Sequence, residues 1–109
     1  MSEWLIEIEN ELRRGRQSRH PGRTRTAARR IAGIAITELQ TQSPKLFFGD
    51  DYYRALQTFM NARGIPVPVA VAARRLQERL APDFTSPSAD PLADAMIIVE
   101  YVKTRLGEK

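Results

Sequence analysis

The fold is decided by residues 26–41, which read Thr-Ala-Ala-Arg-Arg-Ile-Ala-Gly-Ile-Ala-Ile-Thr-Glu-Leu-Gln-Thr. The apolar residues of this stretch recur at helical spacing: Ala27, Ile31, Ile34, Ala35 and Leu39. Such spacing keeps one side of a helix apolar. The other faces carry small residues, including Ala28, Ala32 and Gly33, which let neighbouring elements approach closely. We therefore predict that residues 26–41 form the central helix of a bundle.

An amphipathic helix is predicted before the central one. Ser2 is a suitable N-cap, and a narrow apolar stripe follows it at Trp4, Leu5, Ile8 and Leu12. We expect this first helix to run to about Arg19 and to be ended by Pro21-Gly22. The central helix then begins with Thr24 or Thr26 as its cap. Gly33 costs that helix about 1 kcal/mol relative to alanine, which close packing against another backbone would offset.

Three further helices are predicted after the central one. Asp50 or Asp51 caps the third helix, which ends at Arg63-Gly64 because glycine readily takes the left-handed turn. Pro68 fits the first turn of the fourth helix, which Ala81-Pro82 ends. The fifth helix is framed by two strong signals. Asp90-Pro91 combines a capping carboxylate with a proline at the first helical position, and Gly107 follows the last turn.

No strand pattern competes with these helices, so we predict an all-α, four- to five-helix, mostly antiparallel bundle. At 109 residues the chain suits one domain, residues 1–109. The second and fifth helices are apolar on more than one side. A chain of this size has little interior to cover two such helices, so we expect a homodimer that buries the surplus.

The composition excludes several classes of site. There are no cysteines, which excludes disulfides and thiolate metal sites. No motif for a cofactor or a metal occurs, so we expect neither. The N-terminus reads Met-Ser-Glu-Trp-Leu-Ile-Glu, with acids where a signal peptide needs bases, and no apolar run is long enough to cross a membrane. We expect a cytoplasmic protein that does not bind a membrane.

The net charge of +4 comes from one segment. Residues 13–30 hold eight arginines and no acid, which leaves nine bases against 13 acids elsewhere. Arginine's planar guanidinium suits phosphate oxygens, and the candidate phosphate ligands are Arg13, Arg14, Arg16, Arg19, Arg23 and Arg25. The alternatives are a solvated face, which the glutamates of the first helix partly neutralise, or biased codon usage. No aromatic residue is interleaved, which argues against stacking of single-stranded bases.

Other potentially reactive side chains have simpler interpretations. His20 is the only histidine, and it lacks the partners of a metal site or of an oriented general base. We interpret it as an exposed loop residue. Asp50-Asp51 is explained by capping and by the helix dipole better than by a bound cation.

Two stretches resemble the HEPN superfamily of small helical domains. The alanine-rich helix from Ala27 to Leu39 resembles the family's central helix. The tail from Asp90 to Val102 resembles its final helix, which often follows a proline-containing loop and has an acid-alanine start. The resemblance extends from about Leu5 to Leu106 and lies in helix order and small residues. It implies a four- or five-helix bundle, usually dimeric, which in many members accompanies a small nucleotidyltransferase.

Some HEPN members are ribonucleases that share an arginine followed by four to six residues and a histidine. Arg14 and His20 satisfy this spacing, with five residues between them. In the family, however, the motif lies later in the fold, near the dimer interface, and this chain has no histidine after Arg30. We therefore expect a non-catalytic member.

Three functions follow as hypotheses. The first is a non-catalytic, dimerising binding or partner module, with a nucleotidyltransferase as a possible partner. The second is a HEPN-type ribonuclease that uses Arg14 and His20. The third is salt-sensitive nucleic-acid binding, without cleavage, through the basic segment Arg13–Arg30.

Overall fold

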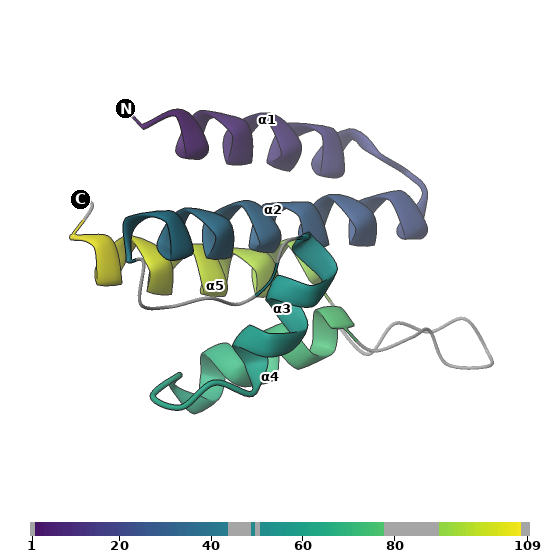
Figure 1. Cartoon of the computed structure of the whole chain (residues 1–109). Coiled ribbons are helices and arrows are strands. Elements are labelled where there is room, and N and C mark those ends of the chain that lie inside the picture. The colour runs from purple at the N-terminus through teal and green to yellow at the C-terminus, as the bar shows by residue number, and fades with distance from the viewer. Residues whose placement is uncertain (1, 44–48, 50, 78–89, 108–109) are drawn as a thin grey trace.

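The computed structural model describes residues 2–43, 49, 51–77 and 90–107, which form five α-helices and no strand. The helices are α1 (Glu3–Gln17), α2 (Pro21–Gln42), α3 (Tyr52–Met60), α4 (Val67–Gln77) and α5 (Pro91–Leu106). In Figure 1, α1, α2 and α5 lie roughly side by side, and α3 and α4 cross beneath them. The prediction of an all-α bundle is confirmed.

The central helix α2 is surrounded by the rest of the chain. It contacts α1, α3, α4 and α5, and its apolar residues from Ala27 to Leu39 are buried. We expected a chain of this size to have too little interior to cover this helix. That expectation is wrong for α2, because four neighbouring helices of the same chain cover it. On α5, Ile98 and Val99 are buried while Ile97 stays 39% exposed.

Helix α2 begins earlier than predicted, at Pro21. We expected Pro21-Gly22 to end the first helix at about Arg19, and Thr24 or Thr26 to cap the second. Instead α1 ends at Gln17 and His20 is the N-cap of α2. Proline suits the first turn of a helix because its φ is preset and its missing N–H has no partner to lose there. The same residue that cannot continue one helix thus begins the next.

The end of α3 also differs from the prediction. The helix stops at Met60 rather than at Arg63-Gly64. The Asn61 side chain donates to the Gln57 carbonyl at 3.1 Å, and the Asn61 backbone N–H turns to Thr58 instead. This side chain thus competes for the carbonyl that the next helical bond would use. Gly64 does take a positive φ of 83°, but in the loop beyond the helix.

The predicted caps of α3 and α5 are observed. The Asp51 carboxylate accepts from the Arg54 N–H at 2.8 Å, and the Asp90 carboxylate accepts from the Ala93 N–H at 3.1 Å. Helix α5 ends at Gly107 in the left-handed conformation, with a φ of 73°. The alternative cap Asp50 and the predicted end of the fourth helix at Ala81-Pro82 lie outside the described residues.

Gly33 allows the close packing that its position in α2 demands. A methyl group at Gly33 would lie 2.5 Å from Cβ of Tyr52 and 2.8 Å from its Cδ1. Real side chains do not approach so closely, so α3 can start against α2 only where the β-carbon is missing. The cost of glycine in mid-helix is offset by this contact, as predicted, although the partner is a side chain rather than a backbone.

Candidate nucleic-acid interface

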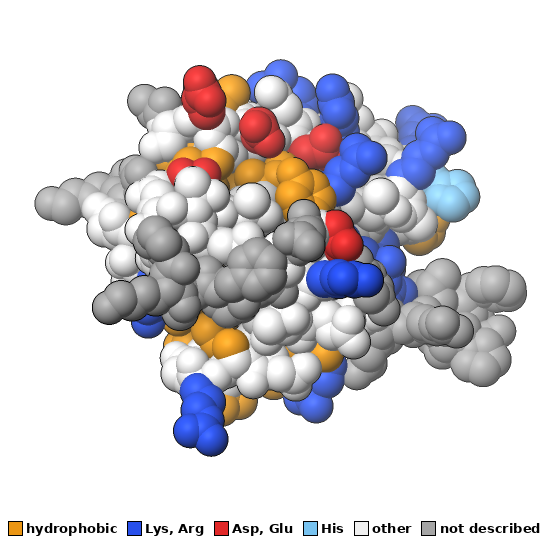
Figure 2. All heavy atoms as spheres, in the orientation of Figure 1, with side chains coloured by type: hydrophobic (Ala, Val, Ile, Leu, Met, Phe, Trp, Pro, Cys, Tyr) orange, Lys and Arg blue, Asp and Glu red, His pale blue; other side chains and the backbone are white. Residues whose placement is uncertain are grey.

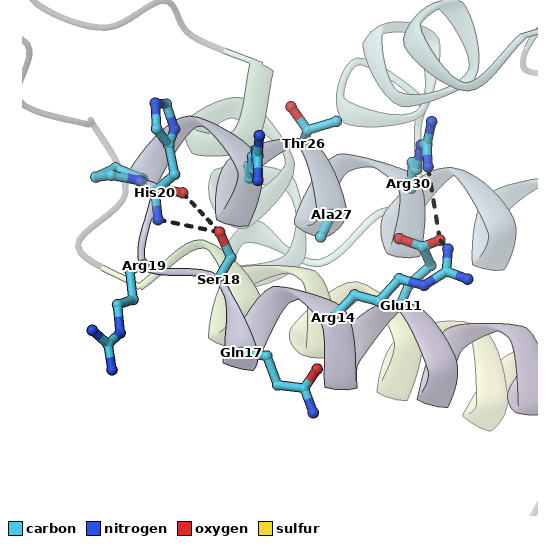
Figure 3. Close-up of a pocket in the computed structure, with 11 residues that line it drawn as sticks. Glu11, Arg14, Gln17, Ser18, Arg19, His20, Thr26, Ala27 and Arg30 are labelled. Carbon is cyan, nitrogen blue, oxygen red and sulfur yellow. Dashed lines mark hydrogen bonds and ion pairs between the residues drawn. The ribbon is translucent and has the colours of Figure 1, made fainter.

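The candidate site is built at the corner where α1 turns into α2. The connection is short, since only Ser18, Arg19 and His20 lie between the two helices. The Ser18 N–H donates to the carbonyl of Arg14 at 3.1 Å, and the Ser18 hydroxyl accepts from the His20 N–H at 3.2 Å. These hydrogen bonds fix the path of the backbone, and with it the positions of the side chains that the corner carries (Figure 3).

Arginines from both helices line one open hollow at this corner, which we call the basic hollow. Its volume is about 810 Å³. Its charged and titratable lining residues are Glu11, Arg14, Arg19, His20, Arg23 and Arg30. The described lining thus holds four arginines and one glutamate. In Figure 2, basic side chains gather over this corner beside the histidine, whereas acidic ones lie toward the N-terminal end of α1.

Glu11 joins the two helices across the hollow. One of its carboxylate oxygens lies 3.2 Å from Nη1 of Arg14, on the same helix, and 3.8 Å from Nη1 of Arg30, on α2. The arginine side chains remain 73% and 57% exposed. Exposed pairs of this kind contribute at most about 1 kcal/mol each to stability. These ion pairs hold the two guanidinium groups beside the hollow. Each guanidinium still has further N–H donors that are available to an anion.

The start of α2 adds to the positive field. None of the described residues in its first turn is acidic, and the His20 side chain makes no capping hydrogen bond there. The hydroxyl of Thr26 donates to the Gly22 carbonyl at 2.9 Å and so does not cap the helix either. The N-terminus of a long helix carries a partial positive charge. His20 and Pro21, at the start of α2, line the hollow, so this partial charge adds to that of the arginines.

The predicted phosphate ligands do not all lie together. Arg14, Arg19 and Arg23 line the basic hollow. Arg13 and Arg16 are exposed on α1 without lining it. Arg25 is only 5% exposed and lies in the interior, which keeps its guanidinium away from a ligand in solvent.

Sequence reasoning missed Arg30 as a site residue. Arg30 lies seven positions after Arg23, which is two helical turns and therefore the same face of α2. Arg25 and Arg29 fall on another face, and Arg29 Nε donates to the Leu76 carbonyl at the end of α4, at 2.6 Å. A helix that is predicted to begin at Pro21 places Arg23 and Arg30 on one face and Arg25 and Arg29 on another, so helical periodicity could have distinguished them.

His20 shares the basic hollow with Arg14. It is exposed, as predicted, at the N-cap of α2. A methyl group at Gly22 would come within 3.2 Å of the imidazole Nδ1 and Cε1, so the ring lies over the first turn of the helix. Within the described residues, no group of acids and histidine could hold a metal ion.

The described helices also include none that is long and apolar enough to cross a membrane. Comparisons of the chain with protein-family models, with curated proteins and with solved structures gave no match. The resemblance to the HEPN superfamily therefore stays a prediction.

Proposed function

We propose that this chain is a non-catalytic binding module that holds nucleic acid by its phosphates in the basic hollow. The observation that carries the proposal is that four arginines line one hollow: Arg14 from α1, Arg23 and Arg30 from α2, and Arg19 from the connection between them. Guanidinium groups bind phosphate oxygens through paired, charge-assisted hydrogen bonds. The positive end of α2 lies at the same place and attracts the same groups.

The test is the salt dependence of binding. A fluorescent 12-nucleotide strand is titrated with the wild type and with the double variant Arg19→Gln, Arg23→Gln at several salt concentrations. Log affinity falls linearly with log salt, and for a single strand each phosphate contact contributes about 0.7 to the steepness of that fall. The double variant, which loses two contacts, is therefore expected to have a slope that is shallower by about 1.4.

The matched control is the double variant Arg63→Gln, Arg74→Gln. Both residues are exposed and line neither the basic hollow nor its neighbours. This control changes the net charge equally, so it is expected to retain most of the affinity and the slope. An equal loss in both double variants would mean that diffuse charge, rather than the basic hollow, binds the strand.

A ribonuclease is the second candidate, and one observation favours it: Arg14 and His20 line the same hollow. In such an enzyme the histidine would take up or give a proton while the arginine stabilised the charge on the phosphate. Cleavage of RNA by the wild type that is lost in His20→Ala, with binding retained, would support it. Binding without cleavage in both proteins would contradict it.

We also propose that the chain forms a homodimer, with support from one helix rather than two. Since α2 is covered within the chain, the support comes from α5, where Ile97 is 39% exposed. Light scattering at high micromolar concentration is expected to give twice the mass of the chain, and Ile97→Lys to halve it. A monodisperse wild-type monomer would contradict the proposal. The HEPN resemblance adds a nucleotidyltransferase as a partner, and co-purification with such an enzyme would test it.

A further inference from the structure

A second hollow, of about 500 Å³, adjoins the basic one along α1 and α2. Its lining residues are Glu7, Asn10, Glu11, Arg14, Arg30, Ile34 and Tyr52. The two hollows share three lining residues, Glu11, Arg14 and Arg30. They therefore meet where Glu11 lies between the two arginines. Together they make a groove that follows α2 from Arg23 to Ile34. At about 1.5 Å per residue this distance is roughly 16 Å.

Tyr52 gives the far end of this groove an aromatic wall. The residue opens α3 directly after the capping Asp51, and its side chain lies against α2 at Gly33. Tyr52 is nevertheless 42% exposed. An aromatic side chain that packs against a neighbouring helix and is still partly exposed can serve as a platform on which a nucleic-acid base stacks.

The two ends of the groove differ in charge in a way that suits the two parts of a nucleotide. The basic hollow has an excess of arginines and attracts phosphates. At the Tyr52 end, the two arginines are balanced by Glu7 and Glu11, and Asn10 adds neutral hydrogen-bonding groups. An uncharged base with donors and acceptors fits this end better than a phosphate does.

We infer that the groove takes a single-stranded nucleic acid, with phosphates in the basic hollow and one unpaired base stacked on Tyr52. This inference rests on the proposed function and specifies its ligand. A duplex cannot offer a base to the ring, because its bases are already stacked and paired. The sequence argument against stacking considered the arginine run alone, and the fold brings in an aromatic residue from α3.

The experiment combines two protein variants with two kinds of strand. Tyr52→Leu removes the ring, and Tyr52→Phe keeps it. The strands are 12-nucleotide oligo-dT and oligo-U. The control for each is a separate single strand of equal length and charge in which the bases are missing. Circular dichroism verifies that both variants fold.

Tyr52→Leu is expected to weaken binding of the strands with bases roughly fivefold or more, and to leave binding of the baseless strands unchanged. Tyr52→Phe is expected to bind like the wild type. The dT and U arms compare DNA with RNA, which here differ in the sugar and in one methyl group of the base. Because the baseless strands keep every phosphate, any change confined to the strands with bases reports stacking rather than lost charge.

Three results would overturn the inference, and they differ in what they leave standing. If the wild type binds all strands in a salt-dependent way and Tyr52→Leu changes nothing, stacking is wrong while phosphate binding stands. If a 12-base-pair duplex binds as tightly as the single strand, the ligand class is wrong. A wild type that binds no strand, even at low salt, removes the proposed function together with the inference.

Discussion

At the scale of single residues, Gly33 shows how one missing methyl group serves both fold and site. It lets Tyr52 lie against α2, and Tyr52 in turn forms one end of the groove. A glycine in mid-helix is otherwise a weak point. Its value is visible only when the neighbour that covers it is known.

Gly33→Ala is therefore expected to destabilise the protein by about 1–3 kcal/mol, although alanine is the better helix former. The added methyl group would displace Tyr52 and the start of α3. Urea unfolding measures the change. Gly22→Ala, in the same helix, meets only the movable ring of His20 and is the control. A more stable Gly33→Ala protein would show that the packing at Tyr52 is loose.

Glu11 lies among the arginines of the groove, where its negative charge would oppose the binding of a phosphate. Glu11→Gln removes a negative charge from the middle of the groove and frees Arg14 and Arg30 from their shared partner. We expect this variant to bind single strands more tightly, with a steeper salt dependence, in the titration described above. Glu9→Gln changes the net charge equally but lines neither hollow, and it is expected to have a smaller effect. Equal gains would show that Glu11 has no special place.

At the scale of elements, the sequence located α5 well and the α1–α2 corner poorly. Asp90-Pro91 and Gly107 are local signals, because the cap and the left-handed turn involve only their own neighbours. Pro21 is ambiguous in isolation, since a proline both ends a helix and begins one. Which role applies depends on how α1 packs on α2, and this is not a local property.

Asp90→Ala is expected to lower the free energy of unfolding by about 1 kcal/mol through loss of the cap of α5. Asp90→Asn keeps an oxygen that can accept from the Ala93 N–H and is expected to be nearly neutral. Urea unfolding of the three proteins tests this difference. If Asn were as destabilising as Ala, the carboxylate charge at the helix start would matter more than the hydrogen bond.

At the scale of the whole molecule, the fold divides the arginines of one segment between two locations. Arg14, Arg19, Arg23 and Arg30 face the basic hollow, whereas Arg25 and Arg29 face the interior and α4. Composition and charge predicted the basic surface but could not separate the two sets. Tyr52 could not be predicted as part of the site at all, because only the packing of α3 on α2 brings it to the arginines.

Two neighbouring arginines are therefore expected to give opposite results. Arg29→Gln loses the 2.6 Å hydrogen bond to Leu76 and is expected to cost about 1–3 kcal/mol of stability, with little change in affinity beyond its charge. Arg30→Gln is expected to weaken strand binding and leave stability nearly unchanged. Urea unfolding and the same titration, applied to both variants, measure the two effects. Identical behaviour would mean that the segment acts as undifferentiated charge.

One wall of the groove is held mainly by a single neighbour, because α1 packs chiefly against α2. We expect a helix that is held along one side to open more readily than the helix at the centre, so its amide protons should exchange sooner than those of α2. In the proposed complex, a bound strand would contact arginines of both helices and would have to be released before α1 could separate from α2. Saturating ligand is therefore expected to slow hydrogen exchange in α1 more than anywhere else in the described helices. The local stability of this helix would then depend on the ligand concentration.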